Sequence, residues 1–132
     1  RYLSYEVPVN GEKIDAVGSF NYGNFVRSIP EDKANLSAHW MNNNHSFMAR
    51  VDYVSQYTNN RQGDTISKFV PVEVQYRYLL DLGKSEATIS LGVQNLFDRE
   101  APFVADGANF SYDPKHHDPR GRVFYMKASY EF

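Results

Sequence analysis

The chain ends in the stretch Val123-Phe124-Tyr125-Met126-Lys127-Ala128-Ser129-Tyr130-Glu131-Phe132, in which apolar residues alternate with mostly polar ones. A period of two places successive side chains on opposite faces of an extended strand. One face of this stretch is therefore apolar and the other mostly polar. The pattern predicts a half-buried β-strand and not a helix.

The same period of two recurs in five further stretches. They run from Leu3 to Val7, from Ala34 to Trp40, from Phe47 to Tyr57, from Val70 to Leu80 and from Ala87 to Val93. The third of these would cover about 33 Å along the strand, or about 23 Å of height at a tilt of 45°, close to the apolar band of a membrane barrel. We expect an all-β fold, an antiparallel up-and-down meander of about six strands.

Short and long connections alternate between these strands. Asn42-Asn43-Asn44 and Asp81-Leu82-Gly83-Lys84-Ser85 have hairpin length and turn-forming residues. The other three connections, Pro8 to Lys33, Asn59 to Ser67 and Asp98 to Arg122, are long and rich in Gly, Asn, Asp and Pro. Long connections of this kind are usually functional, and their alternation with short turns is typical of outer-membrane barrels.

Aromatic residues make up 15% of the chain and favour the barrel over a soluble β-sandwich, which has the same alternation. They gather near the short-turn end of the apolar faces (Trp40, Phe47, Tyr76, Tyr78, Tyr130, Phe132) and near the long-connection end (Tyr57, Phe97, Phe124). Membrane barrels carry two such aromatic girdles. A sandwich more often buries its large aromatic residues in the middle of the core.

Composition excludes several classes of function. The net charge is -2 and Lys and Arg are not clustered, so a nucleic-acid partner is not expected. The chain has no cysteine, and no run approaches the roughly 18 apolar residues of a membrane helix, so any membrane span must consist of strands. Without a nucleophile elbow, a phosphate-binding glycine loop or zinc spacing, we expect a protein that is not an enzyme and needs no cofactor.

Three motifs near the C-terminus point to a family. Gly92-Val93-Gln94-Asn95-Leu96-Phe97-Asp98, Asp118-Pro119-Arg120-Gly121-Arg122-Val123-Phe124-Tyr125 and Tyr130-Glu131-Phe132 together resemble the last two strands of TonB-dependent receptors. Upstream, Gly18-Ser19-Phe20-Asn21 and the stretch from Ser28 to Leu36 with Trp40 are also similar to this family. The resemblance covers nearly the whole chain.

This resemblance implies that the chain is the C-terminal part of a 22-stranded outer-membrane β-barrel of a Gram-negative bacterium. We expect residues 1–132 to be a piece of a longer receptor, without its plug domain, earlier strands and TonB box. Such receptors take up a scarce ligand, namely a siderophore, cobalamin or oligosaccharide, with energy from TonB. The implied partners are outer-membrane lipid, the plug and remaining strands, TonB through the missing N-terminal part, and the outer-membrane assembly machinery.

Two sets of residues are candidates for function. Phe124, Met126, Tyr130 and Phe132 resemble the sorting signal that the assembly machinery recognises. The last long connection holds polar and aromatic residues suited to a ligand, namely Asp106, Asn109, Tyr112, Asp113, His116, His117 and Arg120. Imidazole and carboxylate also suit divalent ions, but adjacent histidines in an extended loop point in different directions. We therefore expect a solvated loop there and no metal. The alternative for the whole chain is a soluble extracellular β-sandwich that binds carbohydrate or protein.

Overall fold

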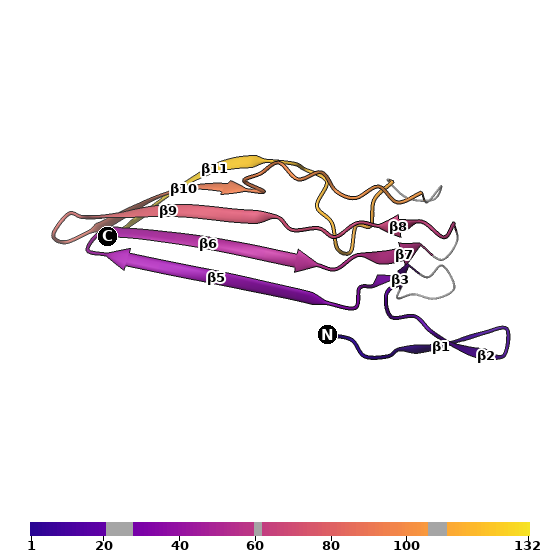
Figure 1. The fold of residues 1–132 in the computed structure, drawn as a ribbon. Coiled ribbons are helices and arrows are strands. Elements are labelled where there is room, and N and C mark those ends of the chain that lie inside the picture. The colour runs from indigo at the N-terminus through magenta and orange to yellow at the C-terminus, as the bar shows by residue number, and fades with distance from the viewer. Residues whose placement is uncertain (21–27, 60–61, 106–110) are drawn as a thin grey trace. The chain divides into compact units, whose positions relative to one another are not determined.

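The computed structural model describes residues 1–20, 28–59, 62–105 and 111–132. Within these ranges the chain is all-β, with eleven strands in three sheets (Figure 1). No helix in the described part of the chain could cross a membrane. The chain forms two compact units. Unit 1 consists of Arg1–Ala34, Tyr53–Val70 and Glu100–Pro119, and unit 2 of Asn35–Asp52, Pro71–Arg99 and Arg120–Phe132.

Unit 2 is built on a single five-stranded sheet, although the first residues of β5 and the last of β6 belong to unit 1. Its strands are β5 (Lys33–Asn42), β6 (His45–Val54), β9 (Val72–Asp81), β10 (Glu86–Gln94) and β11 (Val123–Glu131). The order across the sheet is β11-β10-β9-β6-β5, so neighbours in the sheet follow one another along the chain (Figure 1). The predicted antiparallel meander is thus confirmed for five of its strands.

Both predicted short turns are confirmed, and they lie at the same end of this sheet. Asn43 and Asn44 join β5 to β6, and Asn43 has a φ of 50°, which Asn tolerates better than most residues. The turn from β9 to β10 contains Gly83, whose N–H donates to the carboxylate of Asp81 at 2.8 Å. Residue Glu86 pairs with both Asp81 and Glu131, so the C-terminal end of β11 also lies at this end.

The register of the strands assembles one continuous apolar face. Leu91 of β10 lies opposite Tyr76 of β9 and Met126 of β11, and Tyr76 also lies opposite Phe47 of β6. Because side chains alternate along each strand, every second pair before and after this row shares the same face. The face is continuous because the four strands keep one register, and a slip of one residue would turn a strand's apolar side chains away.

Unit 1 contains the remaining strands in two small sheets. β1 (Glu6–Val9) and β2 (Glu12–Asp15) form a hairpin, and β3 (Ser19–Phe20), β4 (Ser28–Ile29), β7 (Tyr57–Asn59) and β8 (Thr65–Ile66) form a sheet in the order β4-β3-β7-β8. The prediction that the first strand belongs to the meander is wrong. The turn Asn10-Gly11 has φ angles of 52° and 87°, which suit a tight hairpin, so β1 pairs with the next segment of the chain.

The predicted strand from Phe47 to Tyr57 is also wrong in its length. β6 ends at Val54, and Tyr57 begins β7, which pairs in parallel with β3. At the break, the N–H of Ser55 donates to the carbonyl of Asp32 at 2.9 Å, and its hydroxyl accepts from the N–H of Asp32 at 3.0 Å. The ten residues of β6 cover about 30 Å along the strand.

The three long connections supply most of unit 1, which has a core of its own. Val54, Tyr57, Ile66, Phe69 and Val104 are buried together. Ala16 and Ile29 form a second, smaller buried cluster. These segments are therefore packed structure and not simply solvated loops.

Candidate functional site

The apolar face of unit 2 is exposed. Met126 is 74% exposed, and Phe124 is exposed to a similar degree. We call this surface the apolar face, and its exposed large side chains are Phe47, Tyr76, Ile89, Leu91, Phe124, Met126 and Tyr130. Unit 2 taken by itself has one layer. An apolar patch that extends over several strands marks a surface that meets a partner or a membrane.

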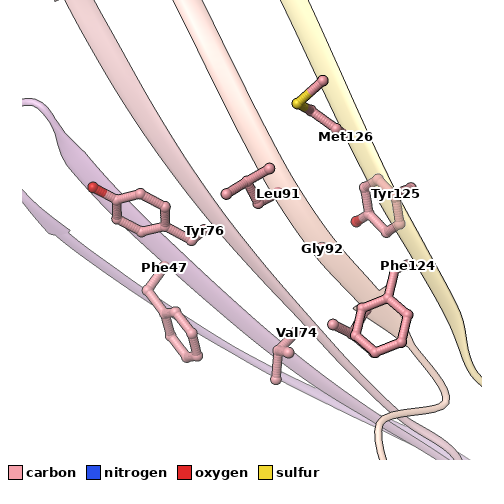
Figure 2. A pocket seen from close by; sticks show the side chains of 9 residues that line it. Phe47, Val74, Tyr76, Leu91, Gly92, Phe124, Tyr125 and Met126 are labelled. Carbon is pink, nitrogen blue, oxygen red and sulfur yellow. The ribbon is translucent and has the colours of Figure 1, made fainter.

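An open hollow of about 490 Å³ lies in this face (Figure 2). The side chains that line it come from β6, β9, β10 and β11 and include Phe47, Tyr76, Leu91, Phe124 and Met126. No charged side chain lines it. The hollow therefore suits hydrocarbon and offers little to a polar ligand.

Three of the predicted sorting residues lie on β11, and the fourth, Phe132, follows its last residue. Phe124, Met126 and Tyr130 share the apolar face, and Phe132 is fully exposed at the end of the chain. Within the described ranges, β11 pairs only with β10 and β5 only with β6, so both are edge strands. The backbone N–H and C=O groups of such edges are templates for a further strand.

The opposite face of unit 2 carries a polar cluster around Tyr125. Its hydroxyl donates to Glu73 at 3.1 Å and accepts from the amide of Gln75 at 3.0 Å. Arg50 lies opposite Glu73 in the register, but its guanidinium binds Asp52 of the same strand at 2.8 Å. Arg50 therefore pairs with a carboxylate of its own strand and not with the one opposite it.

The predicted ligand residues differ in how far the structure exposes them to solvent. Asp113 and His117 are 1% and 4% exposed, Tyr112 and His116 are half-buried, and Arg120 is exposed. Asp106 and Asn109 lie outside the described residues. The expectation of a solvated loop is wrong for Asp113 and His117, because both pack into the core of unit 1.

Asp113 is held by hydrogen bonds from two directions. The hydroxyl of Tyr57 donates to its carboxylate at 2.6 Å, and the N–H of Lys115 donates at 3.0 Å. Burial raises the pKa of Tyr57 well above its usual range, and the hydrogen bond to Asp113 adds to this effect. The phenol of Tyr57 therefore stays protonated at neutral pH.

His117 packs beside this pair. Its ring stacks on Tyr57 with the ring centres 6.1 Å apart and meets Phe69 edge-on at 5.3 Å. Burial lowers the pKa of His117 to about 4, although the charge of Asp113 acts in the opposite direction. In the part of the chain that the structure describes, no group of three or more His, Asp or Glu residues could hold a metal ion.

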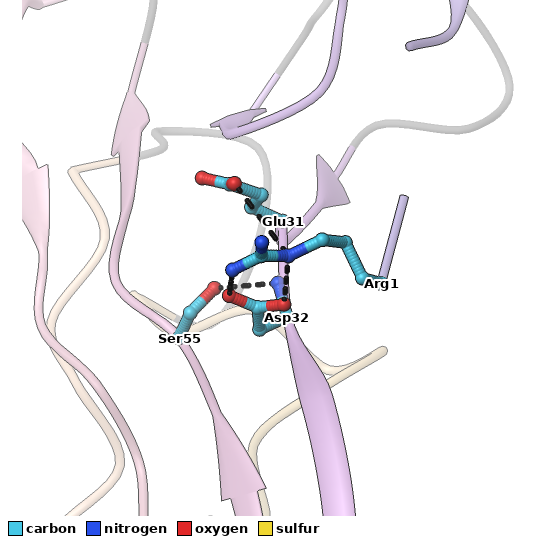
Figure 3. Close-up of polar contacts among 4 residues, drawn as sticks. All are labelled: Arg1, Glu31, Asp32 and Ser55. Atoms are coloured by element: carbon cyan, nitrogen blue, oxygen red, sulfur yellow. Dashed lines mark hydrogen bonds and ion pairs between the residues drawn. The ribbon is translucent and has the colours of Figure 1, made fainter. Parts of the chain in front are cut away.

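A second polar cluster ties the N-terminal segment into unit 1 (Figure 3). The guanidinium of Arg1 donates to both carboxylate oxygens of Asp32, at 2.8 and 2.9 Å, and lies 3.9 Å from Glu31. This hydrogen bonding lowers the pKa of Asp32. Sequence reasoning missed the pair, because nothing in the local pattern relates residues so far apart.

No protein-family model matches this chain, and searches of curated proteins and of solved structures find no significant similarity.

Proposed function

We propose that this chain is the C-terminal part of the outer-membrane β-barrel of a TonB-dependent receptor, with unit 2 as a section of the barrel wall. The observation that carries the proposal is the apolar face. It extends in register across the sheet of a unit that has a single layer. Lipid chains in contact with that face would remove its side chains from water without a second protein layer.

The open edges of the sheet support the same proposal. Membrane strands form closed barrels, because closure leaves no unpaired backbone groups in the lipid. The smallest such barrels have about 8 strands. A five-stranded sheet is too small to close and needs further strands at both β5 and β11. In this proposal the remaining strands of a 22-stranded receptor supply them.

The connections give the proposed orientation. Outer-membrane barrels have short periplasmic turns and longer extracellular segments. The turns at Asn43 and Gly83 would then face the periplasm, and the long connections along the chain would be extracellular. Tyr112, His116 and Arg120 remain candidates for contact with a siderophore, cobalamin or oligosaccharide. The plug and TonB would act through parts of the receptor outside this chain, whose own role is not enzymatic.

The soluble β-sandwich is the weaker alternative. A sandwich covers the apolar face of each sheet with the other sheet, at about 10 Å. Unit 2 by itself provides no such second sheet. The apolar face of a soluble module would then be left in water, which opposes solubility.

Extraction of the protein from Gram-negative cells tests the proposal. We expect it to stay in the outer-membrane fraction through washes with high salt and alkaline carbonate, and to enter solution only with detergent. Such washes release peripheral proteins, because salt screens the charge interactions that hold those proteins on the membrane. A monodisperse, detergent-free monomer with the amide groups of β9 protected from exchange would overturn the proposal in favour of the sandwich.

A further inference from the structure

The core of unit 1 contains a histidine in an unusual position. His117 is 4% exposed, and the rings of Tyr57 and Phe69 flank it. Neither of its ring nitrogens has a hydrogen-bond partner among the residues that the structure describes. A neutral imidazole has one donor and one acceptor, whereas an imidazolium has two donors and a charge. Protonation would therefore place a charge that lacks both water and hydrogen-bond acceptors inside this core.

Charged and titratable groups face His117 from three segments. Asp113 and His116 come from its own turn, Tyr57 from β7 and Lys33 from the start of β5. Asp113 favours the imidazolium, but its carboxylate already accepts from Tyr57 and from the N–H of Lys115. His116 and Lys33, whose Nδ1 and Nζ are 3.2 Å apart, oppose it. Burial outweighs the attraction of Asp113, so the ring stays neutral at neutral pH.

The turn that carries His117 depends on the same packing. The N–H groups of His116 and His117 donate to the carbonyl of Asp113 at 3.2 and 2.9 Å. The rings on either side of His117, Tyr57 and Phe69, belong to the main buried cluster of unit 1. If the imidazole left its position, Tyr57 and Phe69 would lose a packing partner. The turn would then lose its contact with the buried cluster.

We propose that His117 is an acid-sensitive latch of unit 1, which is closed while the imidazole is neutral and opens around residues 113–117 when the imidazole takes up a proton. The ordinary pKa of 6.5 applies in the opened state and about 4 in the closed state. The closed state binds fewer protons between these values. Its stabilisation is complete above about pH 6.5 and falls as the pH drops toward 4. The latch is a property of unit 1 and does not depend on the transport role.

Amide hydrogen exchange of the protein in detergent, measured by mass spectrometry from pH 7 to pH 4.5, tests the latch. After correction for the intrinsic rates, we expect exchange in residues 111–119 to accelerate about tenfold or more at pH 4.5, while β10 stays protected. His117→Phe keeps a ring between Tyr57 and Phe69 but cannot take up a proton, so it should abolish the acceleration. His39→Phe, at an exposed position of β5, is the matched control and should retain it.

Two results would overturn the latch. One is that residues 111–119 of the wild-type protein exchange no faster in acid. The other is that the acceleration persists in His117→Phe, which would show that protonation of carboxylates causes it. If His117→Phe does not fold, NMR of the His117 ring in the wild-type protein decides the question. A ring that titrates near 6.5 while unit 1 stays closed contradicts the proposal, and one that stays neutral until unit 1 opens supports it.

Discussion

The ring of Tyr125 on β11 lies directly over Gly92 on β10, so that a Cβ at position 92 would overlap it. From there the Tyr125 hydroxyl reaches Glu73 and Gln75 on β9. One side chain thus spans three strands on the face of the sheet opposite to the apolar face. Gly92 has no positive φ, so the need for glycine here comes from the ring above it and not from the backbone.

Gly92→Ala should therefore destabilise the sheet. The methyl group forces the Tyr125 ring away, and overpacking of this kind costs about 1–3 kcal/mol of unfolding free energy. Urea unfolding of the protein in detergent measures the loss. In a Tyr125→Ala background the same substitution should cost much less, because the ring is gone. Equal costs in the two backgrounds would show that the ring does not determine the effect.

Tyr57→Phe should weaken unit 1. The substitution keeps the ring against His117 but removes the donor to Asp113 and leaves a buried carboxylate with one partner fewer. Loss of a partner by a buried charged group costs about 1–3 kcal/mol or more. Hydrogen exchange of residues 111–119 at pH 7 should accelerate accordingly. Tyr130→Phe, at a position that is 56% exposed, serves as the control, and an equal effect in both variants would contradict the role of the pair.

Asp32→Asn should release the N-terminal segment. The Arg1 guanidinium loses its carboxylate partner, and the N–H of Tyr2, which donates to the carbonyl of Glu31 at 2.9 Å, should exchange faster. Because the pKa of Asp32 is lowered in the folded chain, the stabilisation is present above its ordinary value of 3.8 and is lost as the pH falls further. Glu31→Gln, whose carboxylate lies 3.9 Å from Arg1, should have a smaller effect. A reversed order would contradict this assignment.

The sheet of unit 2 could be predicted from the sequence because its signals are local. A period of two fixes the two faces of each strand, and Asn43 and Gly83 mark the turns. The hairpin at Asn10-Gly11 carries the same kind of signal, but it lies in a stretch whose length and composition indicate a long connection. What the sequence did not show was that this segment would pair with itself.

Unit 1 could not be predicted in the same way. Its polar composition is typical of a solvated loop, and its key contacts join residues far apart in the chain, such as Tyr57 with Asp113 and Asp32 with Ser55. A buried Asp or His is indistinguishable in sequence from an exposed one until its partner is known. The break after Val54 has the same cause, because Ser55 leaves the strand to bond Asp32.

The most direct test of the proposed function compares the two faces of β11 in a membrane. The 132 residues contain no cysteine, so Met126→Cys and Lys127→Cys each introduce one thiol here, on the apolar face and the opposite face respectively. Each variant is labelled with an environment-sensitive fluorophore and reconstituted in vesicles with brominated acyl chains. We expect strong quenching at position 126 and little at position 127. Equal quenching at both positions, or none at position 126, would contradict the proposal that the apolar face of this sheet meets lipid.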